Sequence, residues 1–365
     1  MKLSFLDELY TTPGPIAGAY LDTSRDIDDP DKAVALRWRH LRDNLAEQGT
    51  DDATVEVMAE AVGTDGDVPG RHGRALFAAH GQIVLDEKLP QPPARDTAHL
   101  SEIPDAMPLA VQHAPDIPYV VVDLSREGEG VALDVVARLQ AGRWPMSRVA
   151  REPRLERLTT ADQWHEGAAR LAQELEDLVH RNGAEVIVLG AAAGQPWERG
   201  VLLNRMPHAL RERTVMVPRG EGQPTADTGR ALLEDEVGDL LTQRLNVRDR
   251  MHLDMYQAQR ARHPAESEGV AGAVAALQRG QAQALLVNRP AEPTRRLWGG
   301  AKPTHIARSA DELWVFGAPS VREAPAESAL IRAVVGTGAE LVVVPREELP
   351  LNDGVGVLLR YTTAP

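Results

Sequence analysis

Hydrophobic positions recur along this chain with two spacings, that of a helix and that of a strand. In residues 29–49 they fall at helical spacing, and the pattern stops at Gly49,. These helical positions are Val34, Trp38, Leu41 and Leu45. The run AEVIVLG at 184–190 is almost continuously apolar, which is typical of a buried strand,. Because segments of both kinds alternate along the chain, the pattern predicts mixed α/β structure.

The first third of the chain is predicted to be one α/β domain that ends near residue 115. Beside the helix at 29–49, the pattern predicts a strand at 15–24 and a shorter helix at 53–63,. Residues 74–89 are typical of two strands joined at a His-Gly turn,. Seven prolines lie between residues 90 and 118, and since proline removes a backbone donor and fixes φ, we expect a linker there,.

The middle third opens with a predicted hairpin, formed by 119–125 and 130–140, and continues into an arginine-rich loop,. The later predictions are a helix at 161–182, the strand at 184–190, a helix at 197–212, a strand at 214–220 and a long helical segment at 227–263,. As one helix the last segment would span about 55 Å. We therefore expect it to break near the sequence LNVRD.

The last third is predicted as another α/β domain. Its elements are a helix and strand within 269–289, a strand at 311–317, a helix at 325–337, a strand at 339–345 and a final strand within GVGVLLRY at 354–361,. The unbroken apolar run of the final strand indicates that both of its faces are covered. The expected fold class is thus α/β, with three mixed α/β domains at 1–115, 116–263 and 264–365.

Charge is distributed unevenly over these three segments. The net charge of −14 is concentrated in residues 1–115, which hold 10 basic and 20 acidic residues. The other two segments are close to neutral and can carry local basic patches,. Asp7 and Glu8 interrupt the place where a signal peptide needs its apolar stretch, and no run approaches the roughly 18 apolar residues of a membrane span,. We therefore expect a cytoplasmic protein that does not bind membranes.

Several kinds of chemistry have no residues to support them. The chain has no cysteine, which excludes disulfides, thiolate zinc sites and a cysteine nucleophile,. It lacks the glycine-rich dinucleotide motif, the Walker lysine loop and the Gly-x-Ser-x-Gly elbow,. No two of its histidines have the i, i+4 spacing of a helical zinc site,. We expect neither a metal nor another cofactor.

Two basic segments are candidate binding surfaces. The first is an expected loop at 142–164, whose candidates are Arg143, Trp144, Arg148, Arg151, Arg154 and Arg157. Guanidinium groups match phosphates, and the Trp144 ring can stack on a base or pack, so the segment suits structured RNA; a solvated charged loop is the alternative. The second lies within 288–308, with the candidates Arg295, Arg296, Trp298 and Lys302, and an exposed loop is again the alternative.

The final strand and the order of elements resemble a known family. Gly354 to Tyr361, preceded by AVAALQRGQAQALLV and GTGAELVVVP, resembles the end of the third domain of the eukaryotic and archaeal class I release factor and of Pelota. The hairpin, loop, long helix and strand of 116–263 resemble the middle domain of these proteins. The whole chain is most similar to the bacterial, actinobacterial release-factor-like branch, akin to the hibernation factor Balon.

The resemblance also tests for catalysis. Release factors of this family carry Gly-Gly-Gln on the loop before the long middle helix, where glycines let the backbone reach the peptidyl-transferase centre. Residues 142–164 hold no glycine after Gly142 and no Gly-Gln pair. Gln163 stands at the expected helix start without glycines, and Ala193-Gly194-Gln195 follows the helix, on the wrong connection. We therefore expect no catalytic residue.

The resemblance implies a monomeric factor that occupies the A site of idle or stressed ribosomes without hydrolysing peptidyl-tRNA. The first basic segment would then contact ribosomal RNA, and the second the ribosome or the GTPase that delivers the protein, with elongation factor Tu as the candidate. Two alternatives stay open. One is a peptidyl-tRNA hydrolase that rescues stalled ribosomes, with Gln163 or an unrecognised group orienting water. The other is an interaction protein unrelated to ribosomes, because a fold does not fix a function.

Overall fold

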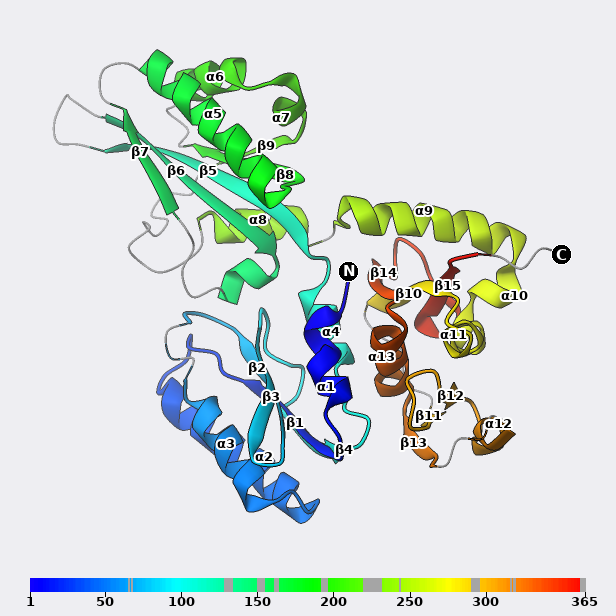
Figure 1. Ribbon diagram of the computed structural model, residues 1–365. Coiled ribbons are helices and arrows are strands. Elements are labelled where there is room, and N and C mark those ends of the chain that lie inside the picture. Colours follow the sequence, from blue (N-terminus) through cyan, green and yellow to red (C-terminus); the bar gives the residue numbers. More distant parts are fainter. Residues whose placement is uncertain are drawn as a thin grey trace. The chain divides into compact units, whose positions relative to one another are not determined.

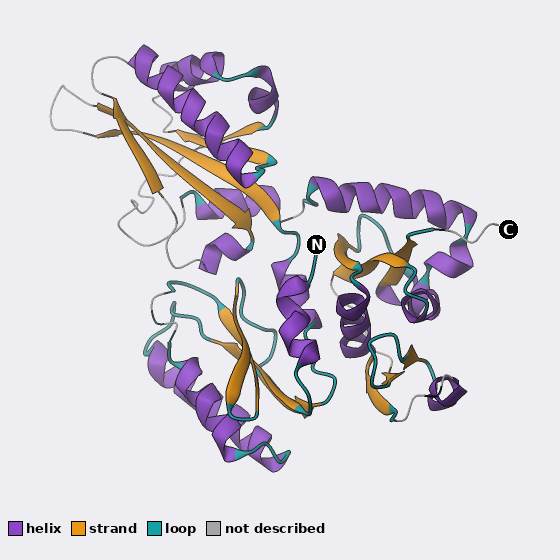
Figure 2. Ribbon diagram, viewed as in Figure 1, coloured by secondary structure: helices purple, strands orange, loops and turns teal. Residues whose placement is uncertain are grey.

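The chain forms two compact units, and the first of them contains both ends of the chain. Unit 1 comprises Met1–Pro115 and Val247–Pro365, and unit 2 comprises Asp116–Asn246. The computed structural model describes all residues except 65, 67, 128–133, 150–154, 161–163, 192–195, 219–231, 243, 290–295, 316, 318–319 and 362–365. Helices and sheets occur in both units (Figures 1 and 2), so the predicted mixed α/β class is confirmed.

The first sheet of unit 1 is antiparallel, with the strand order β3-β2-β1-β4. Its strands are β1 (Ile16–Asp22), β2 (Gly73–Ala79), β3 (Gln82–Leu89) and β4 (Thr97–Ser101). The helices α2 (Pro30–Glu47) and α3 (Asp52–Val62) bury their apolar stripes against one face. The predicted turn between β2 and β3 is confirmed, because His80 and Gly81 both have positive φ, as a type I′ hairpin turn requires,.

The proline-rich stretch predicted as a linker is instead structured, so that prediction is wrong. It contains β4 and the helix α4 (Met107–His113). Pro108 lies in the first turn of α4, where its missing N–H costs nothing,. Apolar residues of α4 join the core, which the proline count alone did not reveal.

The second sheet of unit 1 has the order β14-β10-β15. It consists of β10 (Ala282–Arg289), β14 (Glu340–Pro345), which is parallel to it, and β15 (Val355–Leu359), which is antiparallel. Around it lie α9 (Val247–Arg262), α10 (Pro264–Ser267), α11 (Gly269–Gln278) and α13 (Ala326–Thr337). The strands predicted at 339–345 and at the end of the chain are thus confirmed.

One hydrophobic core joins the two chain segments of unit 1. Leu6 lies just before the short helix α1 (Asp7–Thr11) and Leu9 lies in it. Both are buried together with Leu330 of α13 and Val357 of β15. Helix α1 lies beside α13 (Figure 1). Since side chains from both ends of the sequence fill this interior, neither end is buried without the other.

Both edges of the second sheet are occupied. On the outer side of β15, the buried Gln259 of α9 donates to the carbonyl of Val357 at 2.9 Å and accepts from the N–H of Leu359 at 2.8 Å. On the outer side of β14, the N–H of Leu341 donates to the carbonyl of Met1 at 2.9 Å, and the Met1 amino group donates to the carbonyl of Leu341 at 2.7 Å. These contacts satisfy backbone groups that an edge strand otherwise leaves open.

Gly356 allows Tyr256 of α9 to lie directly on β15. A Cβ at Gly356 would stand 2.6 Å from the Tyr256 hydroxyl oxygen and 2.8 Å from Cζ of its ring. Burial raises the pKa of Tyr256 to about 12. Gly356 is therefore a packing requirement, since a glycine in a strand marks the close approach of another group,.

A small sheet, β12-β11-β13, completes unit 1. Its strands are β11 (Arg296–Gly299), β12 (Ile306–Ala307) and β13 (Arg322–Pro325). The strand predicted at 311–317 is wrong, because Ala310–Val315 form the helix α12. Ser309 accepts a hydrogen bond from the N–H of Glu312, and Glu312 accepts one from the N–H of Arg308, so two side-chain caps start a helix where the apolar pattern indicated a strand,.

Unit 2 contains a five-stranded mixed sheet, with the order β7-β6-β5-β8-β9. Its strands are β5 (Ile117–Glu127), β6 (Asp134–Trp144), β7 (Leu155–Thr160), β8 (Val186–Ala191) and β9 (Thr214–Pro218). The helices α5 (Trp164–Asn182), α6 (Pro196–Arg205) and α7 (His208–Glu212) cover one face, and α8 (Glu234–Leu241) packs on the other.

The predicted helices of this part are confirmed with two differences. The helix expected at 197–212 is two helices, because Pro207 separates α6 from α7,. The segment 227–263 is broken near LNVRD as predicted, since α8 ends at Leu241 and α9 begins at Val247. Within the described part of the chain, no helix is both long and apolar enough to cross a membrane.

Replacing Gly356 with alanine should destabilise unit 1. The added methyl group overlaps the Tyr256 ring, and overpacking of this kind costs about 1–3 kcal/mol of unfolding free energy,. Urea unfolding followed by circular dichroism measures the loss. Gly63→Ala is the matched control in the same unit, since a Cβ there meets no atom within 4 Å. Equal stability of the two variants would contradict the packing described here.

Candidate nucleic-acid interface

The first basic segment is partly strand, so the expectation of one loop over 142–164 is wrong. Strand β6 continues through Arg143 and Trp144, and the 3-10 helix η2 then covers Met146–Val149. Strand β7 pairs antiparallel with β6, placing Arg157 opposite Arg138. Because neighbouring residues of a strand point to opposite faces, Arg143 and Trp144 lie on different sides of the sheet.

Trp144 belongs to the core of unit 2. Its side chain is only 5% exposed and packs in a cluster with Ile117, Tyr119 and Val237. The ring also lies against α8, 3.2 Å from where a Cβ of Gly238 would stand. The sequence allowed two roles for the Trp144 ring, stacking on a base or packing in the core. In the structure the ring packs in the core.

Gly142 and Tyr119 fix the chain as it leaves β6. A Cβ at Gly142 would lie 2.8 Å from the Tyr119 ring, which crosses the strand at this point. The Tyr119 hydroxyl donates to Oγ of Ser147 in η2 at 2.8 Å, and burial raises the pKa of Tyr119 to about 12. The start of the basic segment is therefore held rigidly on the sheet.

Arg143 is exposed and forms a bidentate ion pair with Asp116. Its Nε and Nη2 donate to the two carboxylate oxygens of Asp116 at 2.6 and 2.7 Å. This hydrogen bonding to Asp116 raises the pKa of Arg143. An exposed pair of this kind is worth about 1 kcal/mol or less, so a phosphate group can replace Asp116 at little cost.

Arg148 is held between an acid and an aromatic ring. Its Nε donates to Oε1 of Glu234 in α8 at 3.0 Å, and its guanidinium carbon lies 5.8 Å from the centre of the Trp144 ring. Trp144 thus supports Arg148 from the core side. Arg143 and Arg148 are the two candidates of this segment whose basic side chains the structure describes. Each forms an ion pair with its own acid, Asp116 for Arg143 and Glu234 for Arg148.

The remaining candidates of the first segment are placed only in part. Arg151 and Arg154 lie outside the described residues, as do Gln163 and the Ala193-Gly194-Gln195 triplet. Arg157 is placed by its backbone, in β7. The structure therefore brings Arg143, Trp144 and Arg148 together at one end of the sheet and leaves the role of the others as a prediction.

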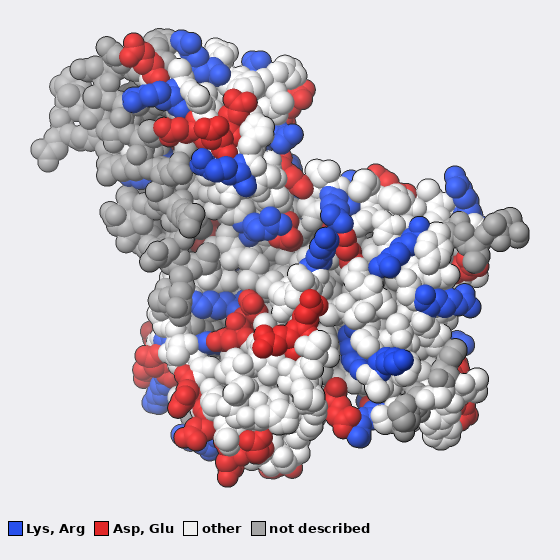
Figure 3. Space-filling model, in the orientation of Figure 1, with Lys and Arg blue, Asp and Glu red and all other residues white. Residues whose placement is uncertain are grey.

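The second basic segment surrounds the small sheet of unit 1. Arg296 begins β11 and pairs with Glu323 of β13 at 2.9 Å. Trp298 is partly buried beside Ala307 and Leu313. Lys302 is exposed and has no ion pair among the described residues, whereas Arg295 lies outside them. Figure 3 shows the contrast with the acidic side chains that gather over α2 and α3.

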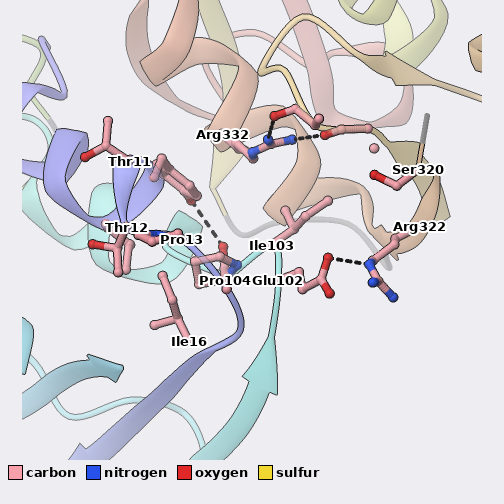
Figure 4. A pocket seen from close by; sticks show the side chains of 16 residues that line it. Thr11, Thr12, Pro13, Ile16, Glu102, Ile103, Pro104, Ser320, Arg322 and Arg332 are labelled. Atoms are coloured by element: carbon pink, nitrogen blue, oxygen red, sulfur yellow. Dashed lines mark hydrogen bonds and ion pairs between the residues drawn. The ribbon is translucent and has the colours of Figure 1, made fainter. Parts of the chain in front are cut away.

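Arg332 of α13 positions the loop that carries Lys302, and sequence reasoning missed it. Its two terminal nitrogens donate to the carbonyls of Gly300 and Ala301 at 2.8 and 2.7 Å (Figure 4). It stands in the wall of a cavity of about 340 Å³, where burial lowers its pKa. The only signal in the sequence is an arginine inside the otherwise apolar helix at 326–337.

A comparison with protein families assigns the middle of the chain. Residues 118–262 match the model of bacterial archaeo-eukaryotic release factor family 2. Residues 118–262 are therefore similar to that bacterial release-factor family. The match supports the resemblance to release-factor-like proteins that the sequence indicated for this part of the chain.

Two curated relatives extend over the whole chain. Both are uncharacterised proteins of Mycobacterium tuberculosis, from the strains CDC 1551 / Oshkosh and ATCC 25618 / H37Rv, and each is 28% identical over 375 residues. The match covers 99% of this chain and 97% of each relative.

Solved structures of the release-factor class are also similar. Pelota of Archaeoglobus fulgidus aligns with 100% of this chain and 94% of its own, at 12% identity and a TM-score of 0.39. A ribosome-bound archaeal Pelota aligns with 100% and 96%, at 13% identity and a TM-score of 0.34. The likeness of the last third to a release-factor domain stays a prediction.

Replacing Trp144 with alanine should destabilise unit 2 by about 3–5 kcal/mol, because a large buried ring is lost from the core,. Urea unfolding monitored by circular dichroism gives the value. Trp197→Ala is the control, since this second tryptophan of unit 2 is 53% exposed, and its loss should cost less than about 1 kcal/mol,. A Trp144→Ala protein as stable as the wild type would show that the ring is not a core residue.

Proposed function

We propose that this protein is a ribosome-associated factor that occupies the A site of idle or stressed ribosomes and does not hydrolyse peptidyl-tRNA. The observation that carries the proposal is a release-factor middle domain, residues 118–262, in a chain without Gly-Gly-Gln. The family match supplies the association with translation, and the missing tripeptide removes the group that would act on the ester bond.

The one Gly-Gly pair of the chain cannot take over the missing role. Gly299 and Gly300 are followed by Ala301, and the carbonyls of Gly300 and Ala301 are held by Arg332. A Cβ at Gly299 would lie 2.5 Å from Cδ1 of Ile103, so this glycine serves a close packing contact. Neither glycine is available as an extended, flexible approach to a substrate.

The first basic segment is the proposed contact with ribosomal RNA. Arg143, Arg148, Arg151, Arg154 and Arg157 supply guanidinium groups for phosphates, and Trp144 supports Arg148 from the core,. Ion pairs with Asp116 and Glu234 hold Arg143 and Arg148 in place before RNA binds. When RNA binds, phosphate oxygens would replace these carboxylates or bind beside them. Because the arginine side chains are already held in position, little affinity would be lost in ordering them.

The second basic segment is the proposed contact with the ribosome or with a delivery GTPase such as elongation factor Tu. Lys302 is exposed on a loop that Arg332 fixes, and Arg296 and Trp298 present the neighbouring strand. A role in hibernation, as for Balon, and a monomeric state off the ribosome are parts of the same proposal.

Binding to vacant ribosomes tests this function. The protein should co-sediment with 70S particles at low salt, and replacing Arg148, Arg151 and Arg154 with alanine should weaken binding and lower the slope of log affinity against log salt by up to about 3. The control replaces Arg170, Arg205 and Arg211, which change the charge of unit 2 equally but lie on helices. No co-sedimentation at low salt would sink the proposal and favour an interaction protein unrelated to ribosomes.

A peptidyl-tRNA hydrolase is the second candidate function, and one observation favours it. Helix α5 begins at Trp164, directly after Gln163, and release factors carry their glutamine on the loop before this helix. Without flanking glycines we expect no release of labelled peptide from a stalled ribosome, and no change with Gln163→Ala. Peptide release that disappears in the Gln163→Ala protein, but persists in Gln173→Ala on the same helix, would establish the hydrolase instead.

A further inference from the structure

Both described arginine side chains of the first basic segment already hold a carboxylate. Arg143 donates to Asp116 at 2.6 and 2.7 Å, and Arg148 donates to Glu234 at 3.0 Å. All four residues belong to unit 2. A phosphate that approaches either guanidinium group therefore meets a resident anion, which it must displace or bind beside.

The packing of α8 places Glu234 beside Arg148. Gly238 lies one turn further along the same helix, and a Cβ there would stand 3.2 Å from the Trp144 ring,. Val237 of α8 is buried in the same cluster as Trp144. Because the helix is fixed on the ring, the carboxylate of Glu234 is held next to Arg148 by the fold of unit 2.

The start of strand β5 places Asp116 beside Arg143. Asp116 directly precedes Ile117, which pairs with Trp144 of β6. The Asp116 side chain is 30% exposed and that of Arg143 is 56% exposed, and in the second pair the acid is again less exposed than its arginine. A phosphate coming from solvent thus meets the guanidinium group first, with the acid close to it.

Such pairing is not general among the exposed arginines of unit 2. Arg170 of α5, Arg205 of α6 and Arg211 of α7 are exposed and have no ion pair within the part of the chain that the structure describes. The two acids of the basic segment lie 27 and 86 residues from their arginines in the sequence. Among these five arginines, the paired ones are those on the surface that is proposed to bind RNA.

A carboxylate next to a guanidinium group opposes the binding of phosphate. A unit charge about 4 Å away, in a setting exposed to water, changes a binding constant about fivefold. Phosphate contacts supply nearly all of the affinity of a protein for nucleic acid of arbitrary sequence. Two resident acids therefore weaken non-specific binding, whereas an RNA that makes further contacts with the protein can bind tightly in spite of this loss.

We infer that Asp116 and Glu234 are specificity-determining residues, which compete with phosphate and limit the binding of the first basic segment to arbitrary RNA. The inference rests on the proposed function, because it takes RNA as the ligand of this segment. It adds that the chain's own acids set the affinity of the segment. Only an RNA that also contacts other parts of the protein is then held firmly.

Fluorescence anisotropy with a short labelled oligouridine tests the inference, since this RNA offers phosphates without a fixed structure. Asp116→Asn and Glu234→Gln should each tighten binding about fivefold, and the double variant by more than about tenfold. Glu166→Gln, which removes an exposed acid at the start of α5, is the charge-matched control and should leave the affinity unchanged. Adding Arg143→Ala and Arg148→Ala to the double variant should abolish the gain, because the acids act through these arginines.

A salt titration separates this role from a merely structural one. An arginine freed from its acid releases counterions when it binds phosphate, so the slope of log affinity against log salt should steepen by up to about 0.7 for each acid removed. Carboxylates that only held the arginines in place would give weaker binding and no steeper slope when replaced. Asn and Gln keep the size of the acids, and Asn also tolerates the left-handed backbone of Asp116, whose φ is 54°,.

The inference is overturned if the double variant binds oligouridine no more tightly than the wild type, or if Glu166→Gln gives the same gain. Co-sedimentation of the same proteins with 70S particles keeps this failure apart from that of the proposed function. A wild type that co-sediments, with no gain in the variants, retains the function and rejects the competing acids. A gain in the variants, with a wild type that does not co-sediment, retains the competing acids and rejects the function.

Discussion

The interior shared by the two ends of the chain is the constraint on which the rest of the structure depends. Leu6 and Leu9, near the start of the chain, and Leu330 and Val357, near its end, are buried in one cluster. Their burial removes apolar surface from water only when both segments are in place. The middle domain is therefore an insertion in the sequence of unit 1, entered after Pro115 and left before Val247.

This organisation separates two kinds of charge. Acidic side chains of the first third gather over α2 and α3, whereas Arg143 and Arg148 lie at one end of the sheet of unit 2. Each of these two arginines pairs with an acid, so the described part of the first basic segment is a set of positioned ion pairs rather than a bare positive surface. RNA binding through such groups is an exchange of carboxylate for phosphate, and its driving force comes largely from the release of counterions.

Much of the fold could be predicted from the sequence, because long periodic segments report which face is buried. The helices at 30–47 and 326–337 and the strand at 340–345 follow directly from their patterns. The errors arose where a short-range signal competed with the apolar pattern. The side-chain caps of Ser309 and Glu312 outweigh the apolar residues that follow them. The prolines in 90–118 stand at positions that a helix or an irregular segment tolerates.

The candidate site was less predictable, since it depends on contacts between distant residues. A strand alternates its faces, so the adjacent Arg143 and Trp144 diverge, one to solvent and the other into the core. The partners Asp116 and Glu234, 27 and 86 residues from their arginines, have no signature in the sequence. The same holds for Arg332, whose carbonyl partners lie 31 and 32 residues away.

The side chain of Gln259 and the backbone of Met1 have a consequence for recognition. Many domains bind extended peptides by pairing them, as one more strand, with the open edge of a sheet. In the sheet β14-β10-β15 backbone groups on both edges already have partners. The Gln259 side chain bonds to the edge strand β15, and the backbone of Met1 bonds to the edge strand β14. An incoming strand therefore cannot pair with the backbone of Leu341, Val357 or Leu359, because these groups already have partners within the protein,. Recognition at these positions would have to use the side chains on the surface of the sheet.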